Sequence, residues 1–219
     1  MRATLRRIAC LAALVTLTAA PSAARAQEEL EGMPLLLSSG DSGLSLSLRL
    51  AYALPLGDAA SGVRFGDVIE GAIPLQLDVG WRFDRRWTVA AFFQYGFAWT
   101  GSSCPPGADC AAWDLRLGAE VLYRILPDAQ WVPWVGLGAG YEWAGATRSF
   151  GAASGNVTSR GFELAEVQAG LDYQWGRSLS YGPYAALTLG RFSTTTSGDI
   201  PDEAMHEWLQ LGIKGTFGF

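Results

Sequence analysis

The only histidine in the chain, His206, is the side chain best suited to proton transfer near neutral pH. Acidic residues lie close to it in the sequence, among them Glu203 and Glu207. A catalytic triad would also need a nucleophile within hydrogen-bond reach of the base. Nearby Ser193 and Ser197 belong to an ordinary Ser/Thr-rich stretch with no motif around them. We therefore expect a solvated histidine without a catalytic role, and we predict no catalytic residue and no cofactor.

The first 26 residues have the three parts of a secretory signal peptide. Arg2, Arg6 and Arg7 form a positive start, residues 8–20 form a short apolar core, and Ala24-Arg25-Ala26 is a small-residue cleavage site. The apolar run is too short to read as a membrane-spanning helix. The sequence therefore predicts an exported chain, with the signal at 1–26 and a lead-in segment without periodicity at 27–42.

Removal of this signal would make the protein strongly acidic. The segment holds four arginines and no acids, so 12 of the 16 Lys and Arg residues remain against 21 Asp and Glu, a net charge of about −9. An acidic chain without a basic run does not have the electrostatics of a nucleic-acid-binding protein.

Cys104 and Cys110 bracket a short segment that contains Pro105-Pro106-Gly107. In an exported protein two nearby cysteines favour a local disulfide. A metal site would need more ligands than these two thiols, and no zinc or phosphate-binding motif accompanies them, so we predict no metal site.

From residue 43 onward the hydrophobic pattern has a period of two, which is typical of strands. In the first stretch apolar residues at every even position from Leu44 to Leu56 alternate with Ser45, Ser47 and Arg49. Similar alternation predicts eight strands, at residues 43–56, 69–83, 87–99, 112–126, 131–144, 161–175, 181–193 and 206–219. The seventh is the weakest, because Arg191-Phe192 breaks the apolar phase and suggests a membrane boundary.

The connections between these strands alternate in length. Short turns are predicted at 84–86, 127–130 and 176–180, and long loops at 57–68, 100–111, 145–160 and 194–205. An even number of strands with short turns at one end and long loops at the other is the layout of an outer-membrane barrel. The predicted fold is all-β: an eight-stranded antiparallel up-and-down transmembrane β-barrel over residues 43–219.

Two features indicate that the apolar face points to lipid rather than to the interior, as it would in a lipocalin. The polar face carries many glycines, including Gly118, Gly138 and Gly170, which suit a narrow interior. The apolar face gathers aromatic residues near both strand ends, as membrane interfaces select. We expect Trp81, Trp87 and Trp175 at the short-turn end. We expect Trp99, Trp113, Tyr141, Trp143 and Trp208 at the long-loop end.

The last stretch, Lys214-Gly215-Thr216-Phe217-Gly218-Phe219, resembles the closing strand of small eight-stranded bacterial outer-membrane barrels, the OmpA/OmpX-like class. The resemblance covers about residues 43–219 and rests on general features, without a family-specific loop motif. It implies location in the outer membrane of a Gram-negative cell envelope, contact with outer-membrane lipid, and insertion by the barrel-insertion machinery. Phe217 and Phe219 would then form the C-terminal assembly signal.

The polar face should place both signs of charge in a space barely wide enough for side chains. Buried charges must be paired or hydrated, so we predict a lumen charge network. Its members are Arg49, Glu70, Asp78, Arg82, Asp114, Arg116, Glu120, Arg124, Glu142, Glu166, Asp172 and Lys214.

The function this supports is non-enzymatic: a structural or surface-interaction barrel whose lumen is closed by the charged network. Two alternatives stay open, a narrow channel for ions or small solutes, and a rim enzyme that acts on outer-membrane lipid through His206. For partners we expect lipid, an extracellular ligand at the outer loops, and no nucleic acid. We expect a monomer.

Overall fold

The structure is a computed structural model that describes residues 42–60, 62–101, 104–105, 107–150, 153–176, 178–200 and 203–218. The predicted signal segment 1–26, nearly all of the lead-in segment 27–42, and Phe219 lie outside the described residues. Within the described ranges, no helix has the length and apolar character needed to cross a membrane.

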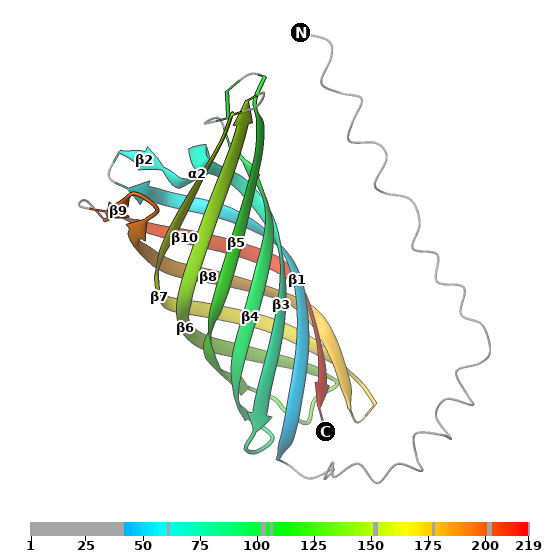
Figure 1. Cartoon of the computed structure of the whole chain (residues 1–219). Coiled ribbons are helices and arrows are strands. Elements are labelled where there is room, and N and C mark those ends of the chain that lie inside the picture. Colours follow the sequence, from blue (N-terminus) through cyan, green and yellow to red (C-terminus); the bar gives the residue numbers. More distant parts are fainter. Residues whose placement is uncertain are drawn as a thin grey trace, which may run out of the picture. The chain divides into compact units, whose positions relative to one another are not determined.

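The chain forms an antiparallel β-barrel whose ring consists of eight long strands (Figure 1). Each pairs with its neighbour in the ring, and β10 pairs with both β8 and β1, which closes the barrel. The strands are β1 (Gly43–Ala60), β3 (Ile69–Arg82), β4 (Trp87–Thr100), β5 (Asp109–Arg124), β6 (Trp131–Phe150), β7 (Ala153–Trp175), β8 (Leu179–Thr195) and β10 (Met205–Gly218). Three short elements lie at the long-loop end: β2 (Val63–Arg64), α2 (Phe65–Val68) and β9 (Gly198–Asp199). The predicted fold class is confirmed.

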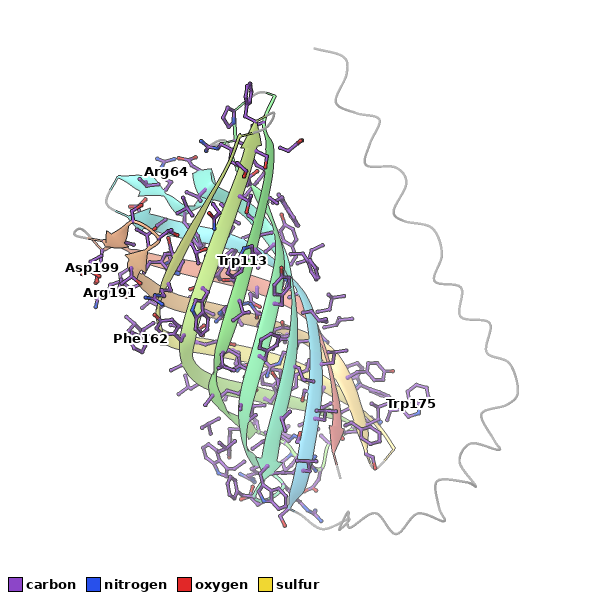
Figure 2. All side chains as sticks on the ribbon, in the orientation of Figure 1. Arg64, Trp113, Phe162, Trp175, Arg191 and Asp199 are labelled. Atoms are coloured by element: carbon purple, nitrogen blue, oxygen red, sulfur yellow. A yellow bond between two sulfur atoms is a disulfide. The ribbon has the colours of Figure 1, made fainter. Side chains whose placement is uncertain are left out.

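The alternation of side chains decides which face each residue occupies. In β1, Ser45, Ser47 and Arg49 are at most 6% exposed, whereas Leu48 is 55% exposed. Figure 2 shows Phe162 and Trp175 projecting outward from the ribbon, and both are more than 60% exposed. An apolar exterior around a polar interior is the pattern of a barrel that spans a lipid bilayer.

Aromatic residues form girdles at both ends of this apolar exterior. At the short-turn end the rings of Trp87 and Tyr123 lie 4.7 Å apart, and those of Trp131 and Tyr173 lie 4.9 Å apart. At the long-loop end Tyr141 and Trp143 lie 4.6 Å apart. Amphipathic rings at these two levels suit the headgroup regions of a bilayer.

The predicted loop at 145–160 is wrong over most of its length, because β6 and β7 continue through it as paired strands to Phe150 and Ala153. On the other side β5 begins at Asp109, which pairs with Ser149. These stretches are rich in Ala, Gly, Ser and Thr and lack apolar alternation. Backbone pairing extends the hairpin here, where no apolar face has to meet lipid.

Register irregularities change the faces of two segments. In β3 the pairing with β4 shifts between Ile69 and Gly71, and in β7 the pairing with β8 shifts between Glu163 and Ala165. Pro74, although it lies inside β3, pairs regularly with Gly96. A bulge adds one residue to a strand, so the residues beyond it point to the opposite face from the one that strict alternation predicts.

The break in the apolar pattern at Arg191-Phe192 is not a break in the alternation of faces. Arg191 points outward and Phe192 inward, in step with the residues before them. In β8 it is the residue types that change: the charged Arg191 stands on the outer face, and Phe192 joins a buried apolar cluster inside the barrel. Such an exchange is expected where the strands leave the hydrocarbon region, because the exterior then meets water.

Candidate functional site in the barrel interior

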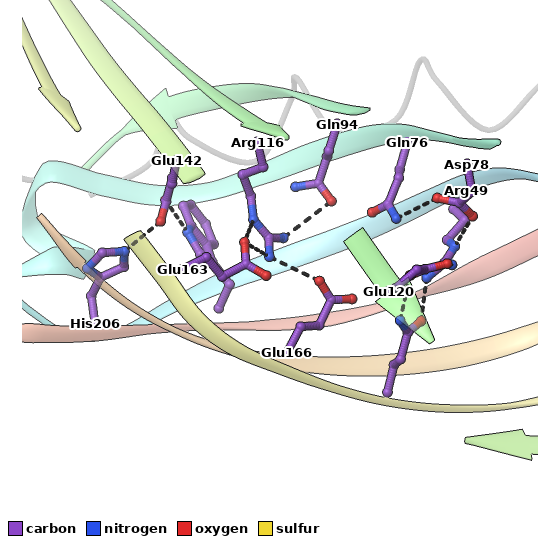
Figure 3. Close-up of polar contacts among 12 residues, drawn as sticks. Arg49, Gln76, Asp78, Gln94, Arg116, Glu120, Glu142, Glu163, Glu166 and His206 are labelled. Atoms are coloured by element: carbon purple, nitrogen blue, oxygen red, sulfur yellow. Dashed lines mark hydrogen bonds and ion pairs between the residues drawn. The ribbon is translucent and has the colours of Figure 1, made fainter. Parts of the chain in front are cut away.

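The interior is occupied by clusters of buried polar side chains from different strands (Figure 3). The first centres on Arg49 of β1, whose Nε donates to Asp78 Oδ2 at 2.7 Å and whose Nη1 and Nη2 contact Gln168 and Glu120. Gln168 Nε2 in turn donates to Glu120 Oε2 at 2.6 Å. We call Arg49, Gln76, Asp78, Glu120 and Gln168 the Arg49 cluster. It joins β1, β3, β5 and β7 across the lumen.

A second cluster centres on Arg116 of β5, which has no exposed surface. Its Nε donates to Glu163 Oε2 at 2.6 Å, and its Nη2 donates to Glu166 Oε2 at 3.2 Å. Both glutamates are on β7 and can reach the same guanidinium because the bulge between them turns both inward. We call Gln94, Arg116, Glu163 and Glu166 the Arg116 cluster.

A third group lies nearer the long loops. Glu142 of β6 accepts from Trp208 Nε1 at 2.8 Å and lies 2.8 Å from His206 Nε2, both residues being on β10. Asp114 of β5 is also buried, and it pairs with Ala144 of β6, two residues along that strand from Glu142. We call these four residues the His206 cluster.

An apolar cap covers the His206 cluster. Phe65 of α2 enters the barrel mouth, where its ring lies 4.8 Å from that of His206 and 4.9 Å from that of Trp208. Phe192 stacks on His206 at 4.1 Å. Small residues from four strands complete the cap: Ala53, Ala72, Ala112 and Ala144.

The short-turn end of the lumen holds a different set. Lys214 lies 3.8 Å from Asp172 and 3.8 Å from the centre of the Trp134 ring, and Trp134 Nε1 donates to Asp172 Oδ1 at 2.8 Å. Arg82 and Arg124, the last residues of β3 and β5, are half-buried at the rim. The charges therefore continue to the mouth of the barrel.

Glycines make room for the large interior side chains. A Cβ at Gly118 would lie 2.5 Å from the Phe92 ring and 2.3 Å from the carbonyl oxygen of Ala139. A Cβ at Gly170 would lie 2.5 Å from the Trp134 ring. The aromatic rings thus occupy the volume that neighbouring glycines leave free.

The structure buries nine of the twelve predicted lumen charges inside the barrel: Arg49, Asp78, Asp114, Arg116, Glu120, Glu142, Glu166, Asp172 and Lys214. Arg82 and Arg124 are at the rim, and Glu70 is exposed. The prediction for Glu70 is therefore wrong, since the register shift at the start of β3 turns it outward. Glu163 was missed for the corresponding reason in β7. A strictly alternating reading has no signal for either bulge.

Two further expectations fail at the long-loop end. His206, expected to be solvated, is 1% exposed, and Trp208, expected in the outer girdle, is 2% exposed. Both share the inward face of β10 with Gln210 and Lys214. Ser193 is not a partner of His206, because its Oγ donates to the backbone oxygen of Arg160. Nothing in the described part of the chain gives His206 a nucleophile.

The outer rim and the last strand give two more results. Cys104 and Cys110 are joined by a disulfide in which the Cα atoms are 6.2 Å apart. Phe217 points outward and is 42% exposed. The described residues include no group of three or more His, Cys, Asp or Glu that could hold a metal ion.

No family model and no curated protein sequence matches the chain. Solved structures share its fold. Neisserial surface protein A is similar with a TM-score of 0.50 and 15% sequence identity, over 81% of this chain and 99% of that one. A major outer membrane protein from Thermus thermophilus is similar with a TM-score of 0.54 and 10% identity, over 81% of this chain and 99% of that one. At these identities the likeness shows the fold alone: that of a small outer-membrane β-barrel.

Proposed function

We propose that the protein is an outer-membrane barrel with a closed lumen and a structural or surface-interaction role. The observation that carries this proposal is the series of buried groups that fills the interior. The Arg49, Arg116 and His206 clusters lie between the Lys214–Asp172 pair near the short turns and the apolar cap at the mouth. The guanidinium groups of Arg49 and Arg116 are each held by two acidic side chains.

Moving these side chains aside to open a path would be costly. Separating one buried ion pair leaves an uncompensated charge, with a cost of about 3 to 5 kcal/mol. An ion would have to pass two such clusters and then the Phe65 ring, which is 1% exposed. We infer that solutes do not pass and that specific function lies at the long-loop end, where the β6–β7 hairpin and the half-buried Cys104–Cys110 disulfide lie.

Single-channel recording of the refolded mature protein in a planar bilayer tests the closed lumen, with folding verified by heat-modifiable gel mobility. We expect no conductance steps at either 0.1 M or 1 M KCl. The double variant Arg116→Ala with Phe65→Ala removes the central cation of the Arg116 cluster and the largest ring that α2 contributes to the apolar cap. We expect this variant to conduct. Stable steps in the parent that scale with salt would instead support a narrow channel and overturn the proposal.

A further inference from the structure

An open cavity of about 410 Å³ lies at the long-loop end of the barrel. Its walls come from α2, the end of β4, the Cys104–Cys110 disulfide and the β6–β7 hairpin, at the end where Figure 1 labels α2. Val68 of α2 lines the cavity and also packs against the apolar cap, so the cavity lies on the outer side of that cap. Small-molecule sites in proteins have volumes of about 300 to 1,000 Å³, so this cavity is large enough for a ligand.

The β6–β7 hairpin gives the cavity a wall that changes from apolar to charged. Ala146 pairs with Val157, and Arg148 pairs with Gly155. Ala144, two residues before Ala146, is buried in the cap. Because side chains alternate along a strand and directly paired residues share a face, all four of these residues lie on the face toward the barrel axis. Arg148 therefore follows the apolar pair on the way out of the barrel.

The inner part of the cavity exposes apolar groups that no described side chain covers fully. Val157 is 54% exposed although it lies on the inward face. A smaller cavity adjoins the first, since Val68, Ala146 and Val157 line both, and it reaches Phe65 and Phe192 of the cap. An apolar body placed here would leave water and contact a continuous apolar floor, which is favourable.

The outer part of the cavity offers hydrogen-bond donors beside open space. Arg148 is the one charged side chain among the described residues that line the cavity, and Asn156 and Thr147 add an amide and a hydroxyl. Arg148 has a partner within the protein, but a guanidinium carries five N–H donors, so further donors stay available for a ligand. A Cβ at Gly155 would meet no atom within 4 Å, which leaves the space across from Arg148 open.

We propose that this cavity binds a small amphipathic carboxylate. The aliphatic or aromatic body of the ligand lies against Val68, Ala146 and Val157, and its carboxylate meets Arg148, whose planar fork of donors matches two carboxylate oxygens. A cationic head would be repelled by the same side chain. This inference rests on the proposed function, because it names the ligand class for the surface-interaction role at the long-loop end.

Methyl NMR of the refolded mature protein in lipid nanodiscs, titrated with hexanoate, tests the site. We expect saturable shifts of the Val68 and Val157 methyl groups. Leu48, which faces the lipid and is 55% exposed, should show only the non-saturating change of a probe that partitions into the bilayer. The absence of saturable shifts at both valines in the parent would overturn the proposal.

A matched pair of glycine variants distinguishes the cavity from the bilayer. G155F places a ring in the open space across from Arg148 and should weaken hexanoate binding at least about tenfold. G215F adds the same ring where a Cβ also has no atom within 4 Å, but on the lipid-facing side opposite Leu48, and should bind within about twofold of the parent. Undiminished binding in folded G155F, with folding verified by heat-modifiable gel mobility, would contradict the site.

The head group is tested with probes of equal chain length. Hexylammonium should bind the parent at least about tenfold more weakly than hexanoate. R148Q should weaken hexanoate about fivefold or more and change hexanol binding by less than about twofold. The charge control is R160Q, which removes an exposed arginine of β7 that donates to Thr194, and it should bind hexanoate like the parent. Equal affinities of the parent for hexanoate and hexylammonium would overturn the assignment of a carboxylate.

Failure of this site and failure of the closed lumen give different results. Conductance steps in the parent would overturn the closed lumen and leave the hexanoate titration unchanged. A parent without saturable hexanoate shifts and without conductance would keep the closed lumen and remove the carboxylate site.

Discussion

His206 and Glu142 meet inside the barrel, with Nε2 and Oε2 2.8 Å apart, although 64 residues separate them in sequence. β10 brings the histidine and β6 brings the glutamate, so the contact crosses the lumen rather than following one sheet edge. Because Phe65 and Phe192 pack on the imidazole, the pair is shut off from the outer solvent. A histidine in this position holds strands together rather than shuttling protons at an open rim.

Replacing His206 should therefore lower the free energy of unfolding, by an amount that depends on how well the new side chain fills the space of the imidazole. His206→Phe retains stacking on Phe192 but leaves Glu142 without one hydrogen bond, for a cost of about 1 to 3 kcal/mol. His206→Ala also leaves a cavity under Phe65 and should cost more, about 3 kcal/mol or above. Urea unfolding in lipid vesicles, followed by tryptophan fluorescence, measures both. If each variant stays within about 0.5 kcal/mol of the parent, the histidine is solvated after all.

Because of the two bulges, alanine substitution should affect the unfolding free energy very differently at Glu163 and at Glu70. Glu163→Ala removes a partner of Arg116 at 2.6 Å in the buried interior, and we expect a loss of about 3 kcal/mol in unfolding free energy. Glu70→Ala, at an exposed position, should change it by less than about 0.5 kcal/mol. Both variants lose one acidic group, so each controls for net charge. A larger effect at Glu70 than at Glu163 would show that the strands keep simple alternation.

The orientations of these two glutamates could not be predicted from the sequence, although most of the fold could. The eight strands and their faces follow from period-two patterns such as Leu44 to Leu56, because lipid on one side and a packed lumen on the other act on every residue. A bulge such as the one between Glu163 and Ala165 comes from how two distant strands register, which no single strand records. The inward orientation of Phe192 and Trp208 was missed for another reason. Beyond the hydrocarbon region an apolar residue no longer has to face outward, so the apolar pattern does not identify the outer face there.

Gly118 should not tolerate a side chain. In Gly118→Ala the new Cβ would meet the Ala139 carbonyl oxygen and the Phe92 ring at 2.5 Å or less, so we expect overpacking to cost about 1 to 3 kcal/mol. Gly155→Ala, with no atom within 4 Å of the added carbon, is the matched control and should fold normally. Equilibrium unfolding and refolding yield measure the difference. Adding Phe92→Leu to this variant should recover part of the lost stability, because it removes the clash with the ring. If nothing is recovered, the loss comes from the clash with the backbone oxygen of Ala139.

The disulfide between Cys104 and Cys110 should stabilise the protein modestly, because the loop that it closes is short. The cysteines are six residues apart, and closing so short a loop is worth about 2 kcal/mol in the chain-entropy description. The double change Cys104→Ser with Cys110→Ser should therefore lower the unfolding free energy of the barrel by no more than about 2 kcal/mol and should speed proteolytic cleavage between residues 101 and 109. Mass spectrometry of the excised parent loop should show a gain of about 2 Da on reduction, from the two hydrogens added. No such gain would mean two free thiols.

Asp84 should give the short turn between β3 and β4 a local pH dependence. Backbone N–H groups of Trp87 and Arg86 donate to its carboxylate and lower its pKa from the ordinary value. A lowered folded-state pKa means that the stabilisation is present above the unfolded-state pKa and is lost as pH falls through the folded-state pKa. The amide resonances of Arg86 and Trp87 should therefore titrate in acid with a midpoint below that of a free aspartate, about 3.9. In Asp84→Asn both titrations should vanish, and a midpoint at or above the free value in the parent would contradict these hydrogen bonds.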